Sequence, residues 1–148
     1  MVYSMISQRA TEQPGPKLWL ASALRPELTC LVCDPAWQWI KPGEPLGEHY
    51  QQVWVDGVLE QLTPAAGYCL LGQLRNGICA DIWVINQDLR WQFTQFIALG
   101  FRQDTQPDTQ VVQPAQLYHY QLDNYNRTRS WNNAKFWANP QNFNRYRW

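Results

Sequence analysis

The fold of this chain depends mainly on residues 51–85, which read QQVWVDGVLEQLTPAAGYCLLGQLRNGICADIWVI. Two dipeptides in this stretch, Asp56-Gly57 and Asn76-Gly77, suit type I′ turns, because both central residues of such a turn need positive φ. Each dipeptide lies between two runs rich in apolar residues, and a short loop separates the two pairs of runs. The stretch therefore predicts two β-hairpins that join into a meander of four antiparallel strands.

Apolar runs outside this stretch predict further strands over residues 17–24, 28–33 and 117–122. Residues 86–99 are the best helix candidate, since apolar side chains recur there at helical spacing and Gly100 can end the helix. Together these elements predict an α+β fold, with an antiparallel sheet of about five to seven strands, one principal helix and an irregular C-terminal arm.

A chain of 148 residues is most simply one domain. We expect residues 1–124 to form a single α+β domain that begins with a loose leader over residues 1–16. Residues 125–148 are expected to form a separate arm, and the proline- and glycine-rich residues 36–47 predict a loop. No stretch approaches the roughly 18 apolar residues of a membrane span, and the N-terminus lacks the apolar core of a signal peptide. The expected location is therefore the cytoplasm, with no membrane partner.

The C-terminal arm, residues 125–148, differs from the rest of the chain in charge and in aromatic content. It contains no acidic residue, and its five basic residues are Arg127, Arg129, Lys135, Arg145 and Arg147. Seven aromatic residues are interleaved with them, namely Tyr125, Trp131, Phe136, Trp137, Phe143, Tyr146 and Trp148. The other 124 residues hold seven basic and twelve acidic residues, a net charge of −5, although the whole chain is neutral. Such an asymmetry indicates an interaction surface.

Cationic and aromatic side chains on the arm suit three kinds of contact. Trp, Tyr and Arg are enriched at protein-binding hot spots, which favours an acidic protein partner or another copy of the chain. Cations that neutralise phosphates and rings that stack on bases also suit single-stranded nucleic acid. In a third interpretation the arm packs on its own acidic domain. The sequence predicts a non-catalytic binding or assembly module, with partner-binding residues Arg127, Arg129, Trp131, Lys135, Trp137, Arg145, Arg147 and Trp148.

Four cysteines raise the question of a zinc site. Cys30 and Cys33 form a C-x2-C pair, but the two residues between them continue a strand, in which residues three apart point to opposite faces. Cys69 and Cys79 are further apart in sequence than the paired ligands of a zinc finger. Buried free thiols are expected instead, with no metal and no cofactor.

The histidines and one acid in an apolar run are the remaining candidates for chemistry. His49 and His119 are expected at the surface or at an interface, although a histidine beside a carboxylate can act as a base. Asp81 would have a raised pKa if it were buried, but we expect it at a sheet edge with its carboxylate in water. The sequence contains no nucleophile motif and no glycine-rich phosphate loop, so it predicts no catalytic residue.

Residues 96–102, FIALGFR, resemble the end of the last helix in GNAT-family acyltransferases, where a leucine-glycine-phenylalanine step leads into a loop and a final strand. The resemblance covers about 30 residues and implies that residues 103–122 supply that loop and strand. In that family, backbone N–H groups of a Gln/Arg-x-x-Gly-x-Gly/Ala loop hold the acyl-CoA pyrophosphate. The corresponding residues here, 85–91, contain no glycine, and Asp88 would repel phosphate. The resemblance therefore implies a GNAT-like, degenerate acyltransferase as an alternative function.

Overall fold

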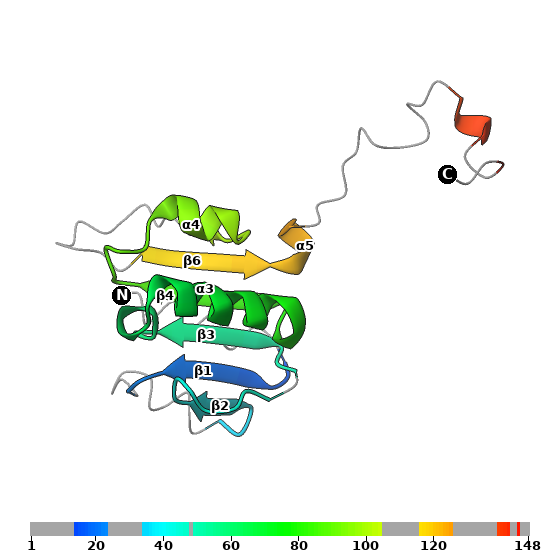
Figure 1. Cartoon of the computed structure of the whole chain (residues 1–148). Coiled ribbons are helices and arrows are strands. Elements are labelled where there is room, and N and C mark those ends of the chain that lie inside the picture. Colours follow the sequence, from blue (N-terminus) through cyan, green and yellow to red (C-terminus); the bar gives the residue numbers. More distant parts are fainter. Residues whose placement is uncertain are drawn as a thin grey trace.

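The computed structural model describes residues 14–23, 34–47, 49–104, 116–125, 139–142 and 145. The described strands are β1 (Lys17–Ala21), β2 (Trp37–Ile40), β3 (Gln52–Asp56), β4 (Asp81–Asn86), β5 (Arg102–Gln103) and β6 (Gln116–Gln121). They form one six-stranded sheet in the order β2-β1-β3-β4-β6-β5 (Figure 1). Strands β1 to β4 pair in parallel, whereas β6 is antiparallel to both β4 and β5.

The two longer described helices, α3 (Pro64–Gln73) and α4 (Phe93–Ala98), pack into the same hydrophobic core on one face of the sheet. In Figure 1, α3 lies in front of β3 and β4. A π-helical turn, η3 (Leu74–Ile78), continues α3, and the remaining helical segments are η2 (Leu59–Gln61), α5 (Leu122–Tyr125) and η5 (Pro140–Asn142). None of the helices in the described part of the chain is long and apolar enough to cross a membrane.

The predicted antiparallel α+β fold is wrong, because the sheet is mixed and mostly parallel. The decisive stretch, residues 51–85, forms β3, η2, α3, η3 and nearly all of β4. This is a βαβ unit, in which Val53 of β3 is the register partner of Ile82 of β4. Two parallel strands cannot be joined by a tight hairpin, so the chain returns along the sheet through α3.

A helix start signal inside the stretch explains the error. The side chain of Thr63 accepts a hydrogen bond from the backbone N–H of Ala66 at 3.3 Å, which caps α3. Pro64 is the first residue of the helix, where the missing N–H of proline removes no helical hydrogen bond. After Pro64, apolar and polar residues alternate less regularly than they do in a half-buried strand. Leu71 and Leu74 are buried against the sheet. Helix capping therefore outweighs the two apparent hairpin turns.

Both dipeptides that suggested hairpins lie in other kinds of turn. Gly57 adopts a positive φ of 66°, as a turn residue should, but it leads from β3 into η2. Asn76 and Gly77 lie within η3, where the helical segment ends before β4. Turn-forming residues at the end of a strand therefore indicate where the strand stops, and the next element decides whether a hairpin follows.

The other predicted elements have mixed outcomes. The strands predicted over residues 17–24 and 117–122 are confirmed by β1 and β6, whereas residues 28–33 lie outside the described residues. The predicted loop over residues 36–47 is wrong in part, because it contains β2. The predicted helix over residues 86–99 is reduced to α4, which begins at a Gln92 capping box. Of its expected apolar face only Phe96 is buried, and the exposed members are Leu89, Phe93 and Ile97.

A row of aromatic side chains crosses the sheet face opposite α3, and its rings stack on one another from β1 to β6. Strand register places Trp39, Trp19, Trp54, Trp83 and His119 side by side on β2, β1, β3, β4 and β6. Ring centroids are 5.8 Å apart between Trp19 and Trp54 and 5.1 Å apart between Trp54 and Trp83. Both pairs are nearly parallel, and all three indoles are buried. Such offset stacking adds about 0.5–1.5 kcal/mol per pair beyond the burial of area.

A glycine in α3 makes room for a buried tryptophan on the helix side of the sheet. A Cβ atom at Gly67 would overlap Cζ2 of Trp91 and would lie 3.3 Å from Cδ2 of Leu59. Trp91 is 3% exposed and also packs against the rings of Tyr68 and Phe96. The helix tolerates this glycine because close packing of the indole compensates for its low helix propensity.

Replacement of this glycine by alanine is expected to destabilise the protein. Gly67→Ala should lower the free energy of unfolding by about 1–3 kcal/mol, since the indole of Trp91 must move. Gly72→Ala is the matched control, because a Cβ there meets nothing within 4 Å in the described structure. That substitution should raise stability by up to about 1 kcal/mol through helix propensity alone. Urea unfolding of both variants measures the difference, and equal effects would contradict the packing of α3 on Trp91.

Candidate functional site

Open parallel sheets usually bind ligands beyond the carboxyl ends of their strands, where the strand order reverses. Here the reversal lies between β1 and β3, because β2 lies on one side of β1 and β3 on the other. Ser22 follows β1 and Gly57 follows β3, and the Ser22 hydroxyl oxygen is 3.8 Å from the position of a Cβ on Gly57. The structure thus identifies the position where this kind of fold would accept a ligand.

The polar groups at this edge are bonded mainly to one another. Glu60 of η2 accepts a hydrogen bond through Oε1 from the backbone N–H of Gln87 at 3.2 Å. Arg90 donates to the backbone oxygen of Glu60 at 2.8 Å and pairs with Asp88. The hydrogen bond from Arg90 holds the pKa of the Asp88 carboxyl below its ordinary value. The guanidinium of Arg90 is therefore committed to protein acceptors, and the edge is poorly suited to phosphate.

Trp39 lies across the carboxyl end of β1. Its indole Nε1 donates a hydrogen bond to the backbone oxygen of Ala21 at 3.1 Å. The ammonium group of Lys41 is 5.5 Å from the centre of the same ring. No glycine occurs in the described residues directly after β1, Ser22 and Ala23, whereas backbone phosphate cradles depend on glycine there. This edge of the sheet therefore does not favour binding of a dinucleotide or of an acyl-CoA pyrophosphate.

A second polar cluster lies near the amino ends of β3 and β4, on the face of the tryptophan row. Asp81 accepts hydrogen bonds from Gln52 Nε2 at 3.0 Å and, through its other oxygen, lies 2.6 Å from His119 Nε2. Gln52 in turn accepts a hydrogen bond from the indole Nε1 of Trp54 at 2.9 Å. The imidazole of His119 stacks on Trp83 with ring centroids 3.8 Å apart. This network joins β3, β4 and β6.

The expectation that Asp81 lies at a sheet edge in water is wrong. Asp81 is 7% exposed, because β4 lies inside the sheet between β3 and β6. Both carboxyl oxygens have hydrogen-bonding partners, as burial of a polar group requires. His119, expected at the surface or at an interface, has a side chain that is 22% exposed and belongs to the same network. We interpret the cluster as structural support for the sheet.

The described cysteines lie in different environments. Cys79 is buried and contacts the backbone oxygen of Asp81 at 3.1 Å through Sγ, and burial raises its thiol pKa to about 11. Cys69 is exposed on α3, so the expectation of a buried thiol is confirmed for Cys79 and wrong for Cys69. Among the described residues, no group of three or more His, Cys, Asp or Glu side chains could hold a metal. Cys30 and Cys33 lie outside these residues.

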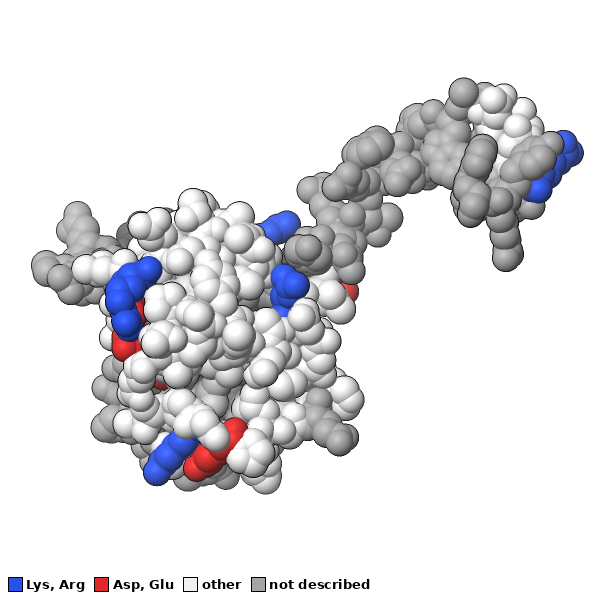
Figure 2. Space-filling view, in the orientation of Figure 1, with Lys and Arg blue, Asp and Glu red and all other residues white. Residues whose placement is uncertain are grey.

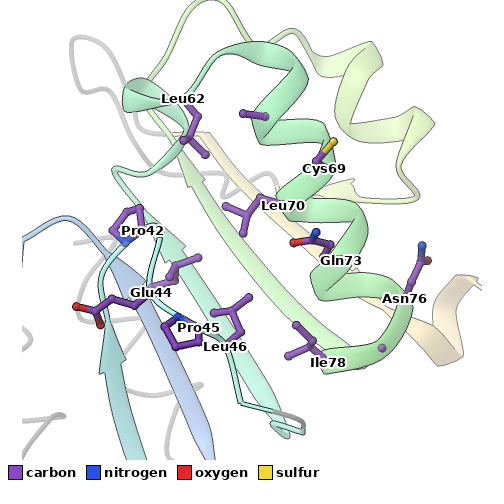
Figure 3. A pocket seen from close by; sticks show the side chains of 14 residues that line it. Pro42, Glu44, Pro45, Leu46, Leu62, Cys69, Leu70, Gln73, Asn76 and Ile78 are labelled. Carbon is purple, nitrogen blue, oxygen red and sulfur yellow. The ribbon is translucent and has the colours of Figure 1, made fainter.

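A cavity of about 780 Å³ lies between α3 and the segment that follows β2, and we call it the α3 groove (Figure 3). Its volume lies within the range of about 300–1,000 Å³ that is usual for ligand pockets. Most of its lining is apolar, including Leu20, Pro45, Leu46, Leu62, Leu70 and Ile78. The face of the molecule that carries α3 is largely free of charged side chains in the view of Figure 2.

One of the eight predicted partner-binding residues lies within the described part of the chain. Arg145 is described, and it is exposed. The other seven, which lie outside the described residues, are Arg127, Arg129, Trp131, Lys135, Trp137, Arg147 and Trp148. The α3 groove was missed because its wall was interpreted as a strand. The proline- and glycine-rich segment after β2 was the available signal, since it joins two parallel strands without the usual helix.

Removal of the Asp81 carboxylate tests the structural role of the network. Asp81→Ala leaves donors on Gln52 and His119 without their acceptor, which should reduce the free energy of unfolding by about 2–4 kcal/mol. Asp123→Ala, at an exposed position in α5, should change it by less than about 0.5 kcal/mol. Chemical denaturation of both variants measures the effect, and equal stabilities would mean that the network contributes nothing.

The resemblance to GNAT acyltransferases is wrong. Its leucine-glycine-phenylalanine step is a helix ending, in which Gly100 has a φ of 85° and the N–H of Phe101 donates to the oxygen of Phe96 at 2.9 Å. Such endings stop helices in many unrelated folds. The four parallel strands exclude the resemblance.

Comparison with known proteins gives a family but no activity. One solved structure that resembles the chain is a TehB-like SAM-dependent methyltransferase from Corynebacterium glutamicum, with a TM-score of 0.47 and 14% sequence identity. The match covers 80% of this chain and 84% of that chain, and a likeness at this level carries no argument about function. No curated protein matches the sequence. Residues 4–148 match the model described as "Family of unknown function (DUF6231)", and the chain belongs to this family.

Proposed function

We propose that this protein is a non-catalytic binding or assembly module. Its C-terminal arm, residues 125–148, contacts an acidic protein surface or another copy of the chain. The observation that supports this proposal most directly is the separation of charge, with five cations and no acid on the arm and a net charge of −5 on the other 124 residues. The opposite charges of the arm and of the other 124 residues favour contact between these two parts of the protein.

The aromatic residues of the arm supply the binding energy in this proposal. Large rings bury much area with few rotatable bonds, and a few such residues typically dominate an interface. The arginines orient the arm and accelerate association, and this contribution weakens as salt screens it. The arm therefore combines apolar anchors with a cationic rim, as protein interfaces commonly do.

The carboxyl edge of the sheet is consistent with binding in place of catalysis. Trp39 lies across the end of β1, and Arg90 is bonded to Asp88 and to the backbone of Glu60. The groups at this edge are thus directed at one another, and the edge lacks a phosphate cradle in the described residues. We therefore assign the partner contact to the arm and leave the edge without a role in it.

Neutralising the arm tests the proposal. A variant in which Arg127, Arg129, Lys135, Arg145 and Arg147 all become Gln should self-associate, or bind its protein partner, at least about tenfold more weakly. The double variant Arg127→Lys and Arg129→Lys is the control, since it keeps the charge but loses the planar fork. Sedimentation velocity and quantitative co-purification measure the two forms of association.

Two outcomes would contradict the proposal. Unchanged association of the neutralised variant would remove the arm from the interface. Binding of a single-stranded oligonucleotide of about 20 nucleotides, with a linear log–log dependence on salt, would assign the arm to nucleic acid instead.

A further inference from the structure

We infer that the α3 groove is the docking site for the C-terminal arm of a second copy of this chain. The inference rests on the proposed function and names the surface that receives the arm. It depends on three features: the way β2 connects to β3, the chemistry of the groove, and the position of α5, from which the arm leaves the sheet.

The connection between β2 and β3 leaves a space in the helix layer. Because the strand order is β2-β1-β3, residues 41–51 must carry the chain across β1. A right-handed crossover in this direction passes on the same face as α3. Such connections usually contain a helix, but the described residues of this one include none, and Pro42 and Pro45 interrupt it. The α3 groove lies where that helix would pack beside α3.

The walls of the α3 groove offer apolar surface to an incoming segment. Its floor includes Leu20 of β1, which is 1% exposed, and one wall is the side of α3 that carries Ala66 and Leu70. Pro45 and Leu46 face α3 from the other wall (Figure 3). Grooves of this shape receive an amphipathic helix that inserts a few apolar anchors.

The charge of the described lining is compatible with a cationic segment. No lysine or arginine is found among the described residues that line the groove, and Glu44 carries a carboxylate there. The arm has five cations and no acid, so its approach meets no repulsion from the lining. Its residues 130–137, SWNNAKFW, have a serine suited to cap a helix and place two tryptophans and a phenylalanine within two turns. This part of the arm has the composition that the groove requires.

The length of the chain favours a second copy over the chain's own groove. Helix α5 follows β6, whereas the groove lies over β1, three strands away in the sheet (Figure 1). Three strand spacings are about 14 Å, and the segment must also rise from the sheet to the helix layer. The five steps from residue 125 to residue 130 span at most about 18 Å when fully extended. This segment would have no length left to pass around α3, and a second copy removes that restriction.

A matched pair of variants on α3 tests the inference. Ala65 and Ala66 are neighbours, both are exposed, and only Ala66 lines the groove in the described structure. Ala66→Arg should weaken self-association at least about tenfold, because it adds bulk and positive charge where the arm docks. Ala65→Arg places the same charge in the same helical turn and should associate like the wild type. Sedimentation equilibrium of the full-length chain at about 1 to 100 µM measures both.

The thiol of Cys69 gives a second measurement, because it is exposed and lines the groove. Alkylation of the full-length chain, followed by mass spectrometry of its peptides, should become slower at Cys69 as protein concentration rises. The buried Cys79 serves as the internal control and should react slowly throughout, since burial raises its pKa to about 11. In the arm-neutralised variant, Cys69 should react at one rate at every concentration.

The outcomes separate this inference from the proposed function. Ala66→Arg and Ala65→Arg could associate equally while the arm-neutralised variant still fails to associate. This result would show that the α3 groove is not the docking site, and it would leave the proposed role of the arm intact. Protection of Cys69 that does not change with concentration would place the arm on its own domain and overturn the assignment to a second copy. A monomer at all concentrations would also overturn it.

Discussion

Strands β3 and β4 pair in parallel, and this pairing determines how the chain between them must run. The two strands are in register from Val53 and Ile82 onwards, and this register stacks Trp54 on Trp83 across the pair. Because the strands run in the same direction, the residues between them must return along the whole sheet. Helix α3 is that return, and it provides both the packing surface for Trp91 and one wall of the α3 groove.

The sequence was informative about individual strands but misleading about their direction. β1 and β6 were predicted near their observed positions, because short apolar runs bounded by turn residues form strands in either kind of sheet. A signal for parallel pairing was nevertheless present. β1, β3 and β4 are buried on both faces, so they appear as continuous apolar runs without polar alternation, which is typical of parallel sheets. Thr63 and Pro64 gave a second signal, which the two glycine turns obscured.

The candidate surfaces were predictable to different degrees. Charge and aromatic content alone identified the arm, because composition requires no knowledge of the fold. The α3 groove could not be predicted, since it arises where a crossover lacks its helix, and this matters only once β2 and β3 are known to be parallel. Likewise, the buried network around Asp81 depends on β4 lying between β3 and β6, which no local pattern specifies.

NMR of the full-length, isotopically labelled chain can establish whether residues 51–85 form a strand, a helix and a second strand parallel to the first. We expect cross-strand contacts in a parallel pattern between β3 and β4, with Val53 opposite Ile82 and Val55 opposite Val84. We also expect helical contacts through α3. Antiparallel contacts across Gly57 or Gly77, with strand rather than helix signals from residues 68–74, would contradict this arrangement.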